Sequence, residues 1–106
     1  MSTLHTRHCQ AQVDRLTDDA AAALMTQLND WELDAGQVHK LYSFKNYYAT
    51  MAFVNLVAWI SHRENHHPDL HVSYNKCNVI YSTHSVGGLS ENDFICAARL
   101  DAALSA

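Results

Sequence analysis

The sequence has little proline or glycine, with one proline and three glycines among 106 residues. It therefore lacks the Gly-rich and Pro-rich stretches that form linkers, and it contains no internal repeat or low-complexity segment. A chain of this length is close to the commonest size of a single domain, and 48% hydrophobic residues are enough for one ordinary core. We expect a flexible N-terminal tail over residues 1–12, where apolar periodicity is missing, and a single domain over residues 13–106.

Basic residues are also scarce, because 7 Lys and Arg stand against 11 Asp and Glu. Domains that bind nucleic acid directly usually carry a basic patch that neutralises phosphates, so we expect no such binding. The longest apolar stretch, residues 51–60, is interrupted by Asn55 and is shorter than the roughly 20 residues that cross a bilayer. The first 14 residues lack the apolar core of a signal peptide, and we therefore expect a cytoplasmic protein without a membrane span.

Cysteine is sparse as well, and Cys9, Cys77 and Cys96 lie far apart without a C-x-x-C pair. An odd number of widely spaced cysteines argues against a disulfide framework and against a thiolate zinc site. We expect free thiols, with Cys77 in a strand and Cys96 in a helix core. The sequence also lacks G-x-S-x-G and the phosphate-cradling glycine motif, so covalent acyl transfer and nucleotide hydrolysis are unsupported.

The first regular elements are predicted from capping residues and from apolar alternation. Thr17, followed by two aspartates, is a typical helix start, because its hydroxyl can cap the first turn and the carboxylates suit the helix dipole. The apolar residues that follow predict a helix over residues 17–29. Residues 31–34 alternate apolar and polar side chains, and a turn leads from them into residues 38–45. We predict two short antiparallel strands joined as a hairpin.

The segment over residues 46–65 has neither glycine nor proline, and nine of the ten residues from 51 to 60 are apolar. It predicts a long helix that is apolar nearly all round, which indicates burial on more than one side. In so small a chain the second side can face another subunit, and we predict an oligomer interface there. The alternative is that the extra apolar side chains are partly exposed. Pro68 disfavours helical conformation at the residue before it, so the helix should end near Asn65.

The last part of the chain predicts two further strands and a helix. Residues 70–74 and 78–82 are rich in strand formers around a turn at Asn75-Lys76, and Gly87-Gly88 then interrupts the pattern. An S-x-x-D capping box from Ser90 to Asp93 opens the final helix. The order α-β-β-α-β-β-α contains no long crossover, so we predict a two-layer α+β domain with a four-stranded antiparallel sheet covered on one face by three helices.

Histidines carry the most distinctive chemistry of the sequence. His66 and His67 are adjacent at the predicted helix exit, and His84 lies just beyond a strand end, where it can return beside them if the last two strands pair. Because an unperturbed imidazole titrates near pH 6.5, such a cluster suits paired acid and base steps. Taken singly, each histidine is more often structural. A zinc site is a further alternative, in which His62 and His66 share a helix face and His71 or His84 adds a third ligand.

A combined set of motifs resembles the pterin-4a-carbinolamine dehydratase family over about residues 15–104. The resemblance implies a small α+β lyase that dehydrates 4a-hydroxytetrahydrobiopterin to quinonoid dihydrobiopterin and needs neither a metal nor a cofactor. The motifs that carry it are Trp31, Phe44-Lys45-Asn46-Tyr47, His66-His67-Pro68-Asp69, Tyr74-Asn75-Lys76, Ser82-Thr83-His84, Gly88-Leu89-Ser90-Glu91 and Asp93.

The resemblance also implies the roles of individual residues. We expect His66 and His84 to transfer protons, while His67 orients the substrate or supports that pair. Two of the implied residues have simpler alternatives, since Trp31 can be a core anchor and Asp93 can be only a helix cap. The implied catalytic residues are His66, His67 and His84, and the implied substrate-binding residues are Trp31, Pro68, Thr83 and Asp93.

Partners follow from the resemblance too. The family forms dimers and tetramers through its long helix and its sheet edges, which matches the interface predicted for residues 46–65. It is also known as a dimerisation cofactor of homeodomain transcription factors, so an alternative function is a coactivator module that binds a transcription factor, with the nucleus as a second location. The sequence departs from the family where many members carry carboxylates, at His62 and Asn65, and in the outer pocket wall at Leu70 and Val72.

Overall fold

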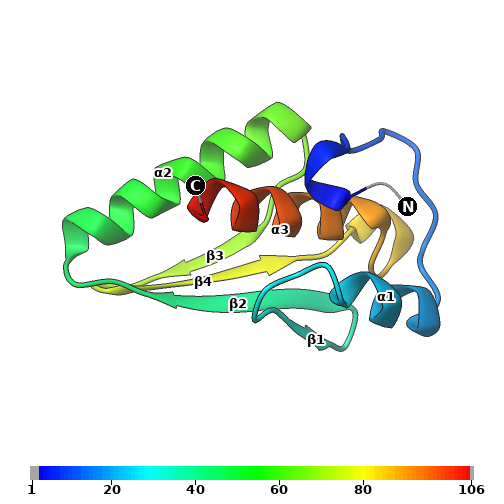
Figure 1. The fold of residues 1–106 in the computed structure, drawn as a ribbon, viewed down its shortest axis with the longest axis horizontal. Coiled ribbons are helices and arrows are strands. Elements are labelled where there is room, and N and C mark those ends of the chain that lie inside the picture. The colour runs from blue at the N-terminus through cyan, green and yellow to red at the C-terminus, as the bar shows by residue number, and fades with distance from the viewer. Residues whose placement is uncertain (1–2, 106) are drawn as a thin grey trace.

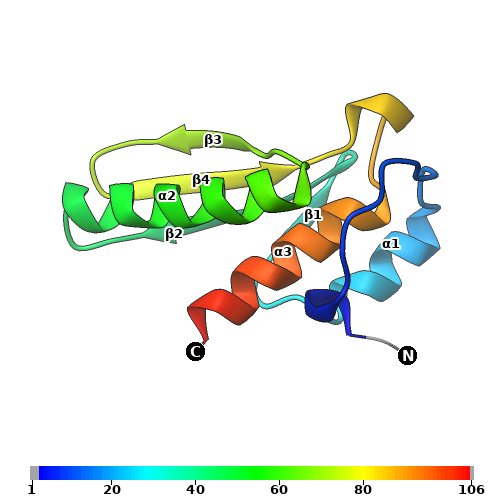
Figure 2. The same ribbon diagram turned by 90° about the horizontal axis from the view of Figure 1, so that it is seen from above.

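The computed structural model describes residues 3–105, in which an antiparallel sheet of order β1-β2-β4-β3 is combined with three α-helices. Helices α2 and α3 cover one face of the sheet, and α1 flanks α3 (Figures 1 and 2). The predicted α+β fold and its order of elements are thus confirmed. The elements are the 3₁₀ helix η1 (Leu4–Thr6), α1 (Asp18–Met25), β1 (Glu32–Asp34), β2 (Gln37–Ser43), α2 (Tyr47–Glu64), β3 (Asp69–Val72), β4 (Lys76–Tyr81), the 3₁₀ helix η2 (His84–Val86) and α3 (Glu91–Leu104).

The sheet places its large apolar side chains toward the helices. Cys77, Val79 and Tyr81 alternate along β4 and are fully buried, and the register sets Val38 of β2 opposite Tyr81. Because successive side chains of a strand point to opposite faces, Ile80 belongs to the uncovered face, where it is only half-buried. The core therefore lies in the single layer between the sheet and the two helices.

Two boundaries differ from the sequence prediction for local reasons. The first helix has the predicted cap, a bond from the Ala20 N–H to the Thr17 hydroxyl, but it ends at Met25 instead of residue 29. Residues 26–28 continue as turns whose N–H groups reach back three residues. In the second hairpin the N–H of Ser73 donates to the carbonyl of Lys76, so the turn precedes Lys76, which belongs to β4.

Helix α2 begins and ends at asparagines. The Asn46 side chain accepts the N–H of Ala49 at 2.8 Å, and Asn65 adopts a left-handed conformation with φ +52°. The N–H of His66 then closes the end by donating to the Ser61 carbonyl. Asparagine tolerates this conformation better than other residues with a side chain. The predicted end of the helix is therefore confirmed, and its immediate cause is Asn65.

The apolar residues of α2 divide between two faces. Phe53, Val57 and Ile60 are buried against the core. On the other side Tyr48 and Trp59 are 83% and 62% exposed, so the extra apolar side chains face outward in the single chain. The interface predicted for this face stays a prediction. Among residues 3–105, no helix is long and apolar enough to cross a membrane.

The N-terminal segment differs from the expected flexible tail. Within residues 3–12, η1 inserts the fully buried Leu4 into the core, and the following residues run along α3 toward the end of α2 (Figures 1 and 2). The Leu4 N–H donates to the side-chain oxygen of Gln27 at 3.0 Å. One apolar anchor and several long-range hydrogen bonds thus fix a segment that lacks local periodicity. Residues 1 and 2 lie outside the described residues.

Candidate active site

His66 is delivered to the site by the left-handed turn at Asn65. Its imidazole is only 12% exposed and stacks on the ring of Tyr81, with ring centroids 6.0 Å apart and an interplanar angle of 11°. Its Nε2 atom lies 2.5 Å from Oδ1 of Asp93, in the first turn of α3. The end of one helix and the start of another therefore meet through a single imidazole–carboxylate contact.

Asp93 is fully buried and uses both of its oxygens. Its second oxygen, Oδ2, accepts the Thr83 hydroxyl at 2.7 Å and the backbone N–H of Ser90 at 3.0 Å. The Ser90 bond belongs to the predicted capping box, so Asp93 is a helix cap as well as the partner of His66. This one carboxylate links the end of α2, the chain beyond β4 and the start of α3.

The hydrogen bonds at Asp93 determine what His66 can do chemically. A carboxylate that receives the Thr83 hydroxyl and the Ser90 N–H acts as an acceptor, so the neutral imidazole of His66 places its Nε2–H toward Asp93. Its Nδ1 lone pair is then left to take up a proton. The Asp93 carboxylate also fixes the orientation of the His66 ring.

The other two predicted catalytic histidines lie near this contact in the chain but are more exposed. His84 opens η2 directly after Thr83, whose N–H and carbonyl bridge to Gly88 and so close the η2 loop. It lines a hollow of about 230 Å³ together with Gln37 of β2. His67 is exposed and precedes the half-buried Pro68.

Trp31 is a buried residue at the start of the first hairpin. Its indole Nε1–H donates to Oδ1 of Asp101 at 2.9 Å, in the last turns of α3. Its ring lies 6.1 Å from that of Tyr81, which also contacts His66. Burial raises the pKa of the Tyr81 phenol, so this hydroxyl stays protonated at neutral pH, and it lies 3.0 Å from the Ser61 hydroxyl.

Comparison with known proteins places these residues in a known family. The sequence profile described as pterin 4 alpha carbinolamine dehydratase matches residues 14–103, nearly the whole chain. This chain belongs to the pterin-4a-carbinolamine dehydratase family. The resemblance noted in the sequence is thus confirmed, and so is the expected enzyme class.

Relatives of the chain carry the same dehydratase name. A protein of Nitrosospira multiformis is 54% identical over 101 residues, which cover 95% of this chain and 89% of the relative. One from Nitrosomonas eutropha is 55% identical over 94 residues, covering 88% and 83% of the two chains. Both are provisionally named pterin-4-alpha-carbinolamine dehydratase.

Two solved structures share the dehydratase fold. A transcriptional coactivator/pterin dehydratase from Brucella melitensis superposes with a TM-score of 0.78 at 26% identity, over 84% of this chain and 97% of that chain. A pterin dehydratase-like protein, described as a RuBisCO assembly factor in the alpha-carboxysome, gives a TM-score of 0.58 at 25% identity, over 70% and 88% of the two chains.

Only some of the expected dehydratase site residues are in direct contact. His66, Thr83 and Asp93 form one hydrogen-bonded group, whereas His67 and His84 are chain neighbours of that group. Among residues 3–105, no three His, Cys, Asp or Glu side chains are grouped so that they could hold a metal ion. The zinc alternative is not supported by the fold, because His66 pairs with Asp93 while the side chain of His62 is exposed.

Sequence reasoning missed three residues at the candidate site. Tyr81 stacks on His66, and strand alternation could have indicated it, since Tyr81 shares the inward face of β4 with Cys77 and Val79. Ser90 was recognised as a cap but not as a donor to the site carboxylate. Glu64, two residues before His66, accepts bonds from the N-terminal segment, and no local pattern pointed to it.

Proposed function

We propose that this protein is a hydro-lyase that dehydrates pterin-4a-carbinolamine to quinonoid dihydrobiopterin by histidine acid and base catalysis. The observation that supports the proposal is the partly buried contact between His66 and Asp93. In the reaction the C4a–O bond breaks, the hydroxyl gains a proton and leaves as water, and a ring nitrogen of the pterin loses a proton. One proton is given to the substrate and one is taken from it, so a pair of imidazoles in opposite protonation states can carry out both steps.

In this proposal His66 and His84 transfer the two protons. Asp93 orients the His66 ring and stabilises its charged form, while Thr83 holds Asp93 through the second carboxylate oxygen. His67 orients the substrate or supports the pair, and Trp31 and Pro68 belong to the surroundings of the pterin. Each proton transfer of this kind contributes roughly 10²-fold to 10⁴-fold in rate. The reaction needs no redox partner, because no atom changes its oxidation state overall.

The proposal is tested with His66→Ala and His84→Ala, following the loss of 4a-hydroxypterin absorbance. After the spontaneous rate is subtracted, we expect each substitution to lower kcat by roughly 10²-fold or more. The matched control is His62→Ala, which removes an exposed histidine from the last turn of α2 and should leave the rate unchanged. If both site variants keep the rate of the unaltered protein, the mechanism is wrong.

A second candidate function is partner binding through the exposed face of α2. Tyr48 and Trp59 are exposed there, and the guanidinium of Arg63 lies 4.7 Å from the Trp59 ring centroid. The structural relative from Brucella melitensis is described as both a coactivator and a dehydratase, so the two functions are compatible in one fold. The first partner to expect is a second copy of this chain, giving a dimer or a tetramer through the long helix and the sheet edges.

Sedimentation of Trp59→Glu tests this face. We expect a smaller species than for the unaltered protein, because a charge replaces an aromatic side chain that other copies would cover. Leu41→Glu is the control, since Leu41 is equally exposed on the central strand β2, away from the helices. An unchanged molecular mass for Trp59→Glu would contradict the interface. A homo-oligomer that does not exchange with helical partners would contradict the transcription-factor role.

A further inference from the structure

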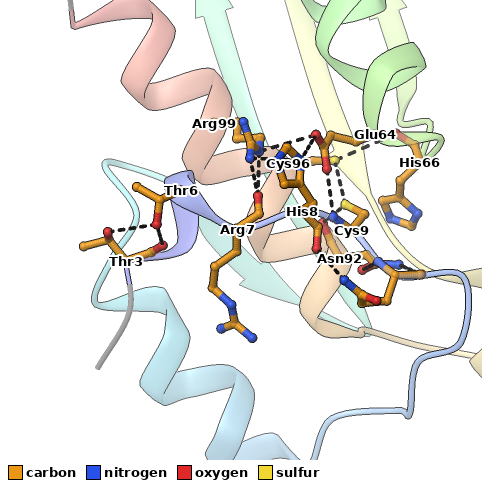
Figure 3. A network of polar contacts seen from close by, with 11 residues as sticks. Thr3, Thr6, Arg7, His8, Cys9, Glu64, His66, Asn92, Cys96 and Arg99 are labelled. Carbon is orange, nitrogen blue, oxygen red and sulfur yellow. Dashed lines mark hydrogen bonds and ion pairs between the residues drawn. The ribbon is translucent and has the colours of Figure 1, made fainter.

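A short N-terminal segment, Arg7 to Gln10, lies against the end of α2 and is called the brace below. The backbone N–H of Cys9 donates to Oε1 of Glu64 at 2.7 Å, and Nδ1 of His8 lies 2.9 Å from Oε2 of the same carboxylate. Figure 3 shows both contacts beside His66. Glu64 is the last residue of α2 and precedes His66 by two positions. The brace is thus bonded to the helix end that delivers His66.

The brace is also bonded to the start of α3. The N–H of Gln10 donates to Oδ1 of Asn92 at 2.9 Å, and Nδ2 of Asn92 donates back to the Gln10 carbonyl at 2.8 Å. The Cys9 thiol donates to the Asn92 carbonyl, 3.6 Å away. Asn92 is the residue immediately before Asp93. The brace therefore contacts α2 two residues before His66 and α3 one residue before Asp93.

The surroundings of Glu64 favour its charged carboxylate form, which accepts hydrogen bonds from the brace. Its side chain is only 6% exposed, and Nε of Arg99 lies 3.6 Å from its carboxylate. Burial acts to raise the pKa of Glu64, but the Cys9 N–H, the His8 contact and the Arg99 charge outweigh it and leave the pKa below its ordinary value. Arg99 also donates to the Arg7 carbonyl, so the guanidinium joins the brace to the same carboxylate.

We propose that Glu64 and Asn92 are positioning residues, through which the brace holds the ends of α2 and α3 at the separation that the His66–Asp93 contact requires. The proposal deepens the dehydratase function and rests on His66 acting there. Only Asn65 stands between Glu64 and His66, and no residue stands between Asn92 and Asp93, so a shift of either helix end moves the site directly. Misplacement of a catalytic group by about 1 Å can cost roughly 10²-fold in rate.

The test compares Glu64→Ala, Asn92→Ala and Glu64→Gln in the full chain. We expect the two alanine variants to lower kcat by about 10-fold to 10²-fold, with KM changed much less, because in this proposal the brace acts through the ends of the two helices and not on the pterin. Glu64→Gln keeps an oxygen for the Cys9 N–H and should recover part of kcat. Glu32→Ala is the matched control, since it removes an exposed carboxylate of β1.

An NMR measurement separates this proposal from the dehydratase function itself. The Nε2 proton of His66, bonded to Asp93, should give a downfield resonance that weakens in Glu64→Ala and Asn92→Ala and stays in Glu32→Ala. If the protein has no activity on the pterin but the resonance still weakens, the dehydratase function fails while the brace is supported. If the resonance and kcat of both alanine variants match the unaltered protein, the positioning role is wrong.

Gln10→Pro provides a second way to loosen the brace if the alanine variants do not fold. It removes the N–H that donates to Asn92 and changes neither helix, because the Gln10 side chain is exposed on the N-terminal segment. We expect the same fall in kcat and the same weakening of the His66 resonance. A folded Gln10→Pro variant with an unchanged resonance and unchanged kcat would overturn the proposal.

Discussion

Nε2 of His66 and Oδ1 of Asp93 lie 2.5 Å apart although the two residues are separated by 27 positions in the sequence. The contact is partly buried, and the other carboxylate oxygen accepts the Thr83 hydroxyl and the Ser90 N–H. Burial of a carboxylate costs free energy unless its oxygens accept hydrogen bonds. Here His66, Thr83 and Ser90 supply those bonds to Asp93. Asp93 therefore combines three duties, since it caps α3, holds the chain after β4 and orients the imidazole.

Asp93→Asn tests this combination. An amide has one oxygen and one NH₂ group, so it cannot accept from His66, Thr83 and Ser90 in the way that the carboxylate does. We expect kcat to fall at least tenfold, which is about 1.4 kcal/mol of transition-state stabilisation, and the free energy of unfolding to fall by about 1–3 kcal/mol. Enzyme assays and urea denaturation measure the two effects. Asp69→Asn, at an exposed carboxylate, is the control, and a fully active Asp93→Asn enzyme would contradict the orienting role.

The lowered pKa of Glu64 predicts how stability depends on pH. A carboxyl whose pKa is lower in the folded than in the unfolded state stabilises the fold above its ordinary pKa of 4.5 and loses this contribution as pH falls through the folded pKa. We expect Glu64→Gln to reduce the free energy of unfolding at pH 7 by about 1 kcal/mol, since charged acceptors make stronger hydrogen bonds than neutral ones. The difference from the unaltered protein should shrink below pH 4.5 in urea denaturation. A difference that stays constant to pH 3 would show that the Glu64 charge is not involved.

Because α2 ends in a left-handed residue, we expect glycine at position 65 to give a more stable protein than alanine. Glycine has no Cβ and adopts this conformation freely, so Asn65→Gly should be at least as stable as the unaltered protein. Asn65→Ala should lose about 1–2 kcal/mol, the cost of placing an ordinary side chain in left-handed backbone. Thermal unfolding measures both variants. Equal stability of the two would mean that the helix end relaxes, and His66 should then move, with a matching fall in kcat.

Trp31→Phe separates the two interpretations of the tryptophan. The substitution keeps an aromatic ring but removes the Nε1–H that donates to Asp101. We expect a loss of about 1–3 kcal/mol in the free energy of unfolding, because a buried carboxylate oxygen loses its donor. Urea denaturation and KM are measured together. A large rise in KM without loss of stability would instead place Trp31 in the pterin pocket.

Local patterns were sufficient to predict most of the fold. The hairpins around residues 35–36 and 73–75 follow from short alternating segments and turn residues, and α2 follows from a long stretch free of glycine and proline. The capping box at Ser90 was visible because its two members are three residues apart. These features were predictable because each depends on residues that are neighbours in the sequence.

The contacts that complete the site were not predictable in this way. The pairing of Trp31 with Asp101 joins residues 70 positions apart, and the brace joins Cys9 to Glu64 over 55 positions. Residues 3–12 are mostly polar and lack apolar periodicity, which is also how a disordered tail appears, although Leu4 is buried in the folded chain. Contacts of this kind depend on how finished elements pack, and the sequence contains no local trace of them.

The sequence separations of these contacts also suggest an order of assembly. The bond from Thr83 to Asp93 closes a loop of ten residues, whereas the bond from Gln10 to Asn92 closes a loop of 82 residues. That increase is about three doublings of loop length, or roughly 2 kcal/mol of additional closure entropy. We therefore expect the carboxylate group to form early with the β3–β4 hairpin and α3, and the brace to close last. In the folded protein the brace should open first, so the amide hydrogens of Cys9 and Gln10 should exchange with solvent before that of Ser90.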